Sequence, residues 1–209
     1  MFPTLRMALV ALCISPLLMS CESEDDAPAP ALEEKTYSNL YAPADPGQPG
    51  QPATGYEPWR YFSLRTGELL TNADSNSTDW DLAFKSTTIR TNSGISGPGE
   101  GRALVVVSAF EEVLEAPADT VLRSDVATNN YAIPTGSGNG WYNYNPANMV
   151  ISPIPGRTIV VKLGDGSGYA KVSITSYYQN APTNPTGTEP SRYYTFRYVV
   201  NTDGTRRLN

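Results

Sequence analysis

The sequence predicts an all-β fold, made mainly of antiparallel strands and hairpins with few short helices, in a single domain over residues 59–209. Apolar and polar residues alternate with a period of two through much of this region, as they do in strands with one buried face. β-branched and aromatic residues dominate the alternating runs, and residues that favour turns separate them. A chain of about 150 residues suits one domain with its own core.

The clearest predicted strands lie in the C-terminal half. Residues 157–163 and 169–178 flank the turn 164–168, whose glycines supply the positive φ that the loop needs, so this segment predicts a hairpin. Residues 191–200 alternate in the same way. Residues 110–114 carry the only helical spacing and are followed by a proline. The remaining predicted strands are 59–64, 79–85, 86–91 and 103–109.

Residues 1–20 have the pattern of a secretory signal peptide. Arg6 and the amino terminus give a positive start, and the apolar run that follows is too short to span a membrane. The run ends in Leu-Met-Ser before Cys21, which resembles the lipobox of bacterial lipoproteins, where the thiol receives diacylglycerol. We therefore expect lipidation at Cys21 and membrane attachment through acyl chains alone. The alternative is an ordinary signal peptide that happens to contain a cysteine.

Residues 21–58 predict a tether. Acidic residues cluster directly after Cys21, and residues 27–58 are rich in Pro, Gly, Ala and Gln, a composition that buries too little apolar surface to fold. The acidic run resembles the surface-export signal of Bacteroidetes lipoproteins, and a solvated spacer is the alternative. We therefore expect a lipid-anchored protein of the outer membrane, exposed at the cell surface.

Composition excludes several classes of functional site. Cys13 is removed with the signal peptide and Cys21 carries lipid, so the mature domain has no thiol for a disulfide, a metal site or a nucleophile. The chain has no His, which excludes Ser-His-Asp triads and His-ligated zinc. Its net charge of −6, without a basic block, argues against nucleic acid as a partner.

The segment from Asp79 to Gly94 holds the most distinctive motif. Trp80, Leu82 and Phe84 alternate with smaller or polar residues, so we expect them to share a core face. Asp81 is expected to accept hydrogen bonds from the backbone at a strand end. Residues 92–94 predict a turn. This motif specifies a fold and does not by itself specify a function.

Two stretches resemble the HmuY-type haem-binding lipoproteins of Bacteroidetes. The first is YFSLRTGELL followed, after a polar insert, by STDWDLAFKSTTIRTNSGISGPGEG; the second comprises IPGRTIVVKLGDGSGYAKVSITSYYQ and SRYYTFRYVVNTDGTRRLN. Together they cover roughly Trp59 to Leu208, and the Trp-Asp-Leu-Ala-Phe string is the most specific part. The resemblance implies an all-β protein that captures haem and passes it to a TonB-dependent outer-membrane receptor.

The haem ligands implied by the resemblance are present only in part. Family members use His, and in some cases Met, on the iron, and this chain has no His. Met149 lies in the segment NPANMVISP, which aligns with a stretch where family members often carry His. It is the only Met that remains after signal cleavage, and a thioether can ligate haem iron. A Met that fills a gap between strands is the alternative.

Four aromatic residues before Met149 are further candidates for a haem site. Three of them lie in the segment GSGNGWYNYNP, which we expect to be a flexible, exposed loop. Exposed aromatic rings on loops often bind ligands, and Tyr can also ligate ferric haem. The same rings could stack on a sugar or cap the sheet. The four residues are Tyr131, Trp141, Tyr142 and Tyr144.

We expect no enzymatic activity. Asp79 and Asp81 form a carboxylate pair of the kind used in glycoside hydrolysis, but no other feature of the sequence supports catalysis. The alternative to haem binding is therefore a lipoprotein of the same fold that has lost haem ligation and binds a glycan or a protein partner.

Overall fold

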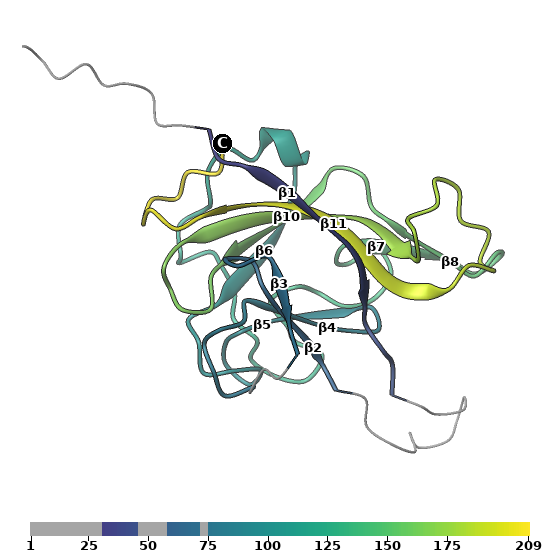
Figure 1. Ribbon diagram of the computed structural model, residues 1–209, viewed down its shortest axis with the longest axis horizontal. Coiled ribbons are helices and arrows are strands. Elements are labelled where there is room, and N and C mark those ends of the chain that lie inside the picture. The colour runs from purple at the N-terminus through teal and green to yellow at the C-terminus, as the bar shows by residue number, and fades with distance from the viewer. Residues whose placement is uncertain (1–30, 46–57, 72–74) are drawn as a thin grey trace, which may run out of the picture. The chain divides into compact units, whose positions relative to one another are not determined.

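The computed structural model describes residues 31–45, 58–71 and 75–209 (Figure 1). Residues 31–209 belong to one compact unit. Regular structure in the described residues is almost entirely antiparallel β-strand, which confirms the all-β prediction. The one helix among them is the 3-10 turn η1 (Phe110–Glu112), at the predicted helical spacing. The described part of the chain contains no helix that is long and apolar enough to cross a membrane.

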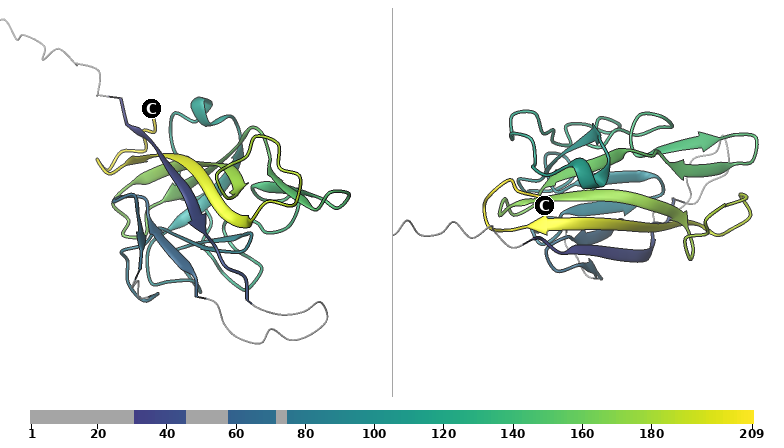
Figure 2. Two further views of the ribbon diagram at one scale, coloured as in Figure 1. Left: turned by 45° about the vertical axis from the view of Figure 1, so that its right-hand side comes forward. Right: turned by 90° about the horizontal axis from the view of Figure 1, so that it is seen from above.

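Two sheets and a separate hairpin make up the domain (Figures 1 and 2). The larger sheet has the strand order β1-β11-β10-β9-β6 and the smaller one the order β3-β2-β4-β5. In the larger sheet the strands are β1 (Glu34–Tyr41), β6 (Arg102–Val107), β9 (Arg157–Lys162), β10 (Tyr169–Tyr178) and β11 (Ser191–Asn201). In the smaller sheet they are β2 (Arg60–Ser63), β3 (Glu68–Leu70), β4 (Leu82–Lys85) and β5 (Thr88–Thr91), and the hairpin consists of β7 (Tyr142–Asn145) and β8 (Val150–Pro153).

Aromatic side chains from both sheets form the core between them. Phe196 of β11 packs edge-on against Phe62 of β2, with ring centroids 5.2 Å apart, and stacks on Phe84 of β4 at 5.6 Å. Such pairs contribute roughly 0.5–1.5 kcal/mol beyond the apolar area that they bury. Leu82 and Phe84 lie in this core, as predicted. Trp80 is also fully buried, but it is not part of the same core cluster and packs against Tyr61, with ring centroids 4.9 Å apart.

All seven predicted strands occur, with bounds that differ by at most a few residues. The predicted hairpin is β9–β10, and Gly166 in its turn has a φ of +76°. The register between β10 and β11 shifts after Ile174, and this irregularity places Tyr177 and Tyr178 in the core although they are neighbours in sequence. The sequence interpretation missed three short strands, β3, β7 and β8.

The prediction of a tether over residues 21–58 is wrong for its middle part. Residues 34–41 form β1, an edge strand of the larger sheet that pairs with β11, with Tyr37 opposite Phe196 and Leu40 opposite Tyr194. Asn39 has a φ of +61° within an irregularity of the pairing, so the alternation that identifies strands breaks there. The folded domain therefore begins before β1. Residues 1–30, including Cys21, and residues 46–57 lie outside the described residues.

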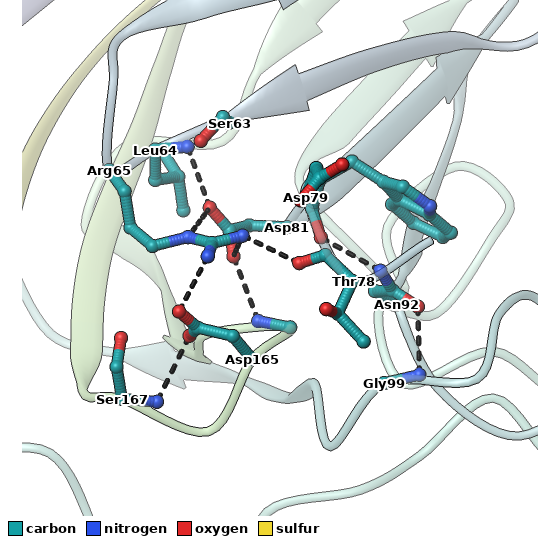
Figure 3. A network of polar contacts seen from close by, with 12 residues as sticks. Ser63, Leu64, Arg65, Thr78, Asp79, Asp81, Asn92, Gly99, Asp165 and Ser167 are labelled. Carbon is teal, nitrogen blue, oxygen red and sulfur yellow. Dashed lines mark hydrogen bonds and ion pairs between the residues drawn. The ribbon is translucent and has the colours of Figure 1, made fainter. Parts of the chain in front are cut away.

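A buried carboxylate joins the two sheets (Figure 3). Oδ2 of Asp81 accepts a hydrogen bond from the backbone N–H of Leu64, and Oδ1 accepts one from that of Gly164, both at 2.8 Å. Arg65 lies 3.4 Å from Asp81 and donates to Asp165 in the β9–β10 turn at 2.5 Å. The predicted backbone-binding role of Asp81 is confirmed, and the motif acts in the fold.

Asn92 acts through its side chain in the predicted turn. Its amide group donates to the backbone carbonyl of Trp80 at 2.9 Å and its side-chain oxygen accepts from the N–H of Gly99 at 3.0 Å (Figure 3). Gly94 supplies the positive φ of +54°. Residues 92–94 therefore form the predicted turn, and Asn92 also links it to the loop that leads to β6.

Candidate functional site

A cleft of about 390 Å³ lies beside the turn between β4 and β5. We call it the Trp59 cleft. Four separate parts of the chain build it: the segment after β1, the residue before β2, the β4–β5 hairpin and the segment between η1 and β7. The lining residues are Ala44, Asp45, Trp59, Lys85, Ser86, Thr88, Arg90, Asn129 and Tyr131.

Arg90 lies between two aromatic rings in this cleft. Its guanidinium carbon is 3.9 Å from the ring centroid of Trp59 and 4.7 Å from that of Tyr131. Nη2 of Arg90 also donates a hydrogen bond of 2.6 Å to the hydroxyl oxygen of Tyr131. Arginine stacks on aromatic faces because its planar cation is weakly hydrated. The Nε group of Arg90 is buried and has no hydrogen-bond acceptor among the described residues.

Lys85 provides a second cation near Trp59. Its ammonium nitrogen lies 5.8 Å from the ring centroid of Trp59 and 2.5 Å from Oδ1 of Asp45. Only 10% of the Lys85 side chain is exposed, so its charge is largely removed from water. A desolvated cation of this kind needs an anionic partner. Asp45 fills this role in the structure, which demonstrates that a carboxylate group fits beside Lys85.

Contacts with the core fix the β4–β5 turn that carries these groups. Ser86 has a φ of +49°, and its carbonyl oxygen accepts a 2.8 Å hydrogen bond from the hydroxyl of Tyr194. The indole N–H of Trp141 donates to the carbonyl of Thr87 at 3.0 Å. Burial raises the pKa of Tyr194 well above its usual value, so this hydroxyl keeps its proton and remains a donor. Buried aromatic side chains therefore fix the position of the β4–β5 turn.

Asp125 positions the wall that contains Tyr131. One oxygen of its carboxylate accepts from the N–H of Ala132 at 2.8 Å, and the other accepts from the N–H of Thr91 at 3.0 Å. These two bonds tie the residue after Tyr131 to the residue after Arg90. Burial raises the pKa of Asp125, and the backbone donors oppose that shift.

Three of the four predicted haem-binding aromatics are not exposed, and Tyr131 in the wall of the cleft is itself only 6% accessible. Only 3% of Trp141 and 8% of Tyr142 is accessible, because both pack into the core. Trp141 lies 5.7 Å from Tyr177 and 5.1 Å from Tyr194, measured between ring centroids. The expectation of a flexible loop with open aromatic faces is wrong for these two residues, which support the β4–β5 turn.

Tyr144 and Met149 are exposed on the β7–β8 hairpin. Tyr144 is 44% accessible on β7, and Met149 is 69% accessible with a φ of +58° immediately before β8. A Cβ on Gly187 would overlap the carbonyl oxygen of Asn148, so the β10–β11 loop packs closely against the tip of this hairpin. Met149 is thus an accessible thioether and does not fill a core gap. It is not among the residues that line the Trp59 cleft.

The structure therefore divides the five predicted site residues among three places. Tyr131 lines the Trp59 cleft, Trp141 and Tyr142 lie in the core behind it, and Tyr144 and Met149 lie on the hairpin. Sequence reasoning missed the cleft residues Trp59, Lys85, Arg90 and Asp45 and the supporting Asp125. A usable signal was the placement of Lys85 and Arg90 on the two adjacent predicted strands 79–85 and 86–91 of an acidic chain.

The cleft has the chemistry of a site for a flat ligand that carries negative groups. Trp59 offers partly exposed aromatic surface and Lys85 and Arg90 carry positive charge, whereas Tyr131 is only 6% accessible. Among the described residues no group of three Asp, Glu, His or Cys side chains lies close enough together to hold a metal ion.

Comparison with known proteins assigns most of the domain. A family model described as HmuY protein matches residues 55–198, which is more than half of the chain. The match begins shortly before Trp59 and ends within β11, so it includes the cationic and aromatic residues of the cleft. No curated protein matches the chain.

Proposed function

Because the chain belongs to the HmuY family, we propose that it binds and scavenges haem, using the Trp59 cleft. Haem is a flat apolar ring with two propionate groups along one edge. The presence of two cations, Lys85 and Arg90, within 6 Å of the Trp59 ring is the observation that carries this proposal. The cations would pair with the propionates, and the Trp59 and Tyr131 walls would contact the ring.

The size of the cleft supports a ligand of this class. Its volume of about 390 Å³ falls in the lower part of the range of roughly 300–1,000 Å³ that is typical of ligand pockets. The cleft would bury one edge of a porphyrin, and the rest of the ring would extend beyond the lining residues.

For the iron we propose two side chains. Tyr131 is the one predicted ligand that lines the cleft, and tyrosine oxygen is an established axial ligand of ferric haem. Met149 offers an exposed thioether, which favours the reduced metal. Because Met149 does not line the cleft, it would ligate iron only on the part of the ring that projects from the cleft.

The remaining expectations concern the setting of the protein. We propose that Cys21 carries the lipid anchor, that the domain is displayed at the outer membrane, and that it transfers haem to a TonB-dependent receptor without catalysing a reaction. These proposals rest on the lipobox pattern and on family membership. The absence of His from the chain favours the alternative, a family member that has lost haem ligation and binds a glycan or a protein partner.

Haemin titration tests the proposal. The chain from residue 22 onward retains the whole compact unit of residues 31–209 and is the protein to use. We expect a shifted Soret band and quenching of tryptophan fluorescence, and Trp59→Phe should remove much of the quenching because Trp59 is the tryptophan that lines the cleft. An unchanged haemin spectrum at saturating protein would reject haem as the ligand and favour the alternative.

A further inference from the structure

The segment that follows β1 forms one wall of the Trp59 cleft. We call residues 42–45 the strap. Its first half is held firmly, because the N–H of Ala42 donates to a carbonyl of β11 at 2.8 Å and the carbonyl of Pro43 accepts from the N–H of Ser86 at 2.9 Å. Ala42 and Pro43 are buried, whereas Asp45 is exposed. The strap is therefore attached to β11 and to the β4–β5 turn, and its carboxylate end lies at the cleft.

The two partners of the ion pair between Asp45 and Lys85 differ in their access to water. Oδ1 of Asp45 lies 2.5 Å from Nζ of Lys85, and the exposed fraction is 35% for the Asp45 side chain and 10% for that of Lys85. A carboxylate that already reaches water can turn away at little cost, whereas the enclosed cation would be left uncompensated. Asp45 therefore leaves Lys85 at low cost only when another anion takes its place.

Asp45 occupies the place that an anionic group of a ligand would need. The strap lines the same cleft as Lys85, and two carboxylates beside one ammonium group repel each other. Because Asp45 belongs to the same chain, its effective concentration at Lys85 is high without a separate binding step. A ligand therefore has to compete with an internal carboxylate.

We propose that Asp45 is an autoinhibitory residue, which occupies Lys85 in the ligand-free protein and is exchanged for an anionic group of the ligand. Asp45 then lowers the affinity of the cleft and excludes anions that bind too weakly to displace it. This inference rests on the proposed function, because it takes the same cleft as the ligand site. It concerns the regulation of that site and not the identity of the ligand.

The haemin dissociation constant of Asp45→Asn tests the competition. The chain from residue 22 onward is titrated and tryptophan quenching is measured, with folding checked by thermal melting. Asp79→Asn is the matched control, since Asp79 is exposed and is not among the residues that line the cleft. We expect Asp45→Asn to bind haemin about threefold more tightly or better, and the control to bind like wild type. In a Lys85→Gln background, Asp45→Asn should have no effect, because Asp45 then has no cation to occupy.

A carbodiimide cross-link tests the exchange in the wild-type chain. The reagent joins a carboxylate and an amine that are in contact, and Asp45 and Lys85 meet this condition at 2.5 Å. We expect mass spectrometry to detect an Asp45–Lys85 cross-link in the ligand-free protein, and saturating haemin to suppress it.

Two results would overturn the inference while haem binding stands. One is a folded Asp45→Asn protein that binds haemin no more tightly than wild type, and the other is a cross-link whose yield is unchanged at saturating haemin. If Asp45→Asn does not fold, the cross-link in the wild-type chain decides alone. A wild-type protein that does not bind haemin would instead reject the proposed function together with the inference.

Discussion

Replacement of Asp81 by alanine tests the buried network that joins the two sheets. The substitution removes the acceptor of two buried backbone donors, the N–H groups of Leu64 and Gly164, and each such loss costs roughly 1–3 kcal/mol. Burial raises the pKa of Asp81, so removal of the carboxyl relieves part of its own desolvation cost. The net loss of unfolding free energy should be about 2–4 kcal/mol.

Asp79→Ala is the matched control. Asp79 lies two residues earlier in the same motif and is exposed, so its replacement should change stability by no more than about 0.5 kcal/mol. Urea unfolding followed by tryptophan fluorescence measures both variants, with the slope of the transition checked for each. Equal and small effects of the two substitutions would refute the assignment of Asp81 as the acceptor that holds the sheets together.

Three further predictions concern pH, iron and the anchor. Hydrogen bonds from Tyr169 and Lys162 hold the pKa of Asp119 below its usual 3.8. The stability that Asp119 contributes is therefore complete above pH 3.8 and is lost as the pH falls through the lower pKa of the folded state. The difference in melting temperature between wild type and Asp119→Asn should close in acid. Met149→Ala should shift the ferrous haem spectrum toward five-coordinate iron if the thioether is a ligand, and an unchanged spectrum would exclude it. Cys21→Ser should abolish incorporation of labelled palmitate, and retained label would contradict the lipoprotein assignment.

Sequence patterns identified the long strands because a strand with one buried face alternates apolar and polar residues. β10 and β11 carry apolar residues at every second position, and both formed as predicted. β1 was not predicted, because it is an edge strand with polar residues at most positions and with Asn39 in a left-handed conformation. Its stability comes from pairing with β11, a long-range interaction that no local pattern contains.

The candidate site was harder to predict because it is assembled from distant segments. Trp59, Lys85 and Tyr131 come from three parts of the chain and meet only in the folded domain. The glycine-rich segment around Trp141 suggested exposure, but its glycines permit close packing: a Cβ on Gly140 would overlap the carbonyl oxygen of Pro134. Composition therefore predicted a loop where residues from Tyr142 form β7, and it also gave the wrong side-chain burial for Trp141 and Tyr142.

The haemin dissociation constant of Arg90→Gln tests the central claim most directly. Arg102→Gln is the matched control, because Arg102 is a partly buried arginine on β6 that does not line the Trp59 cleft. Loss of a hydrogen-bonded cation at the ligand carboxylate should weaken haemin binding by about tenfold or more, whereas the control should bind like wild type. Folding of both variants is checked by thermal melting. Wild-type affinity in a folded Arg90→Gln protein would contradict the assignment of this cleft as the haem site.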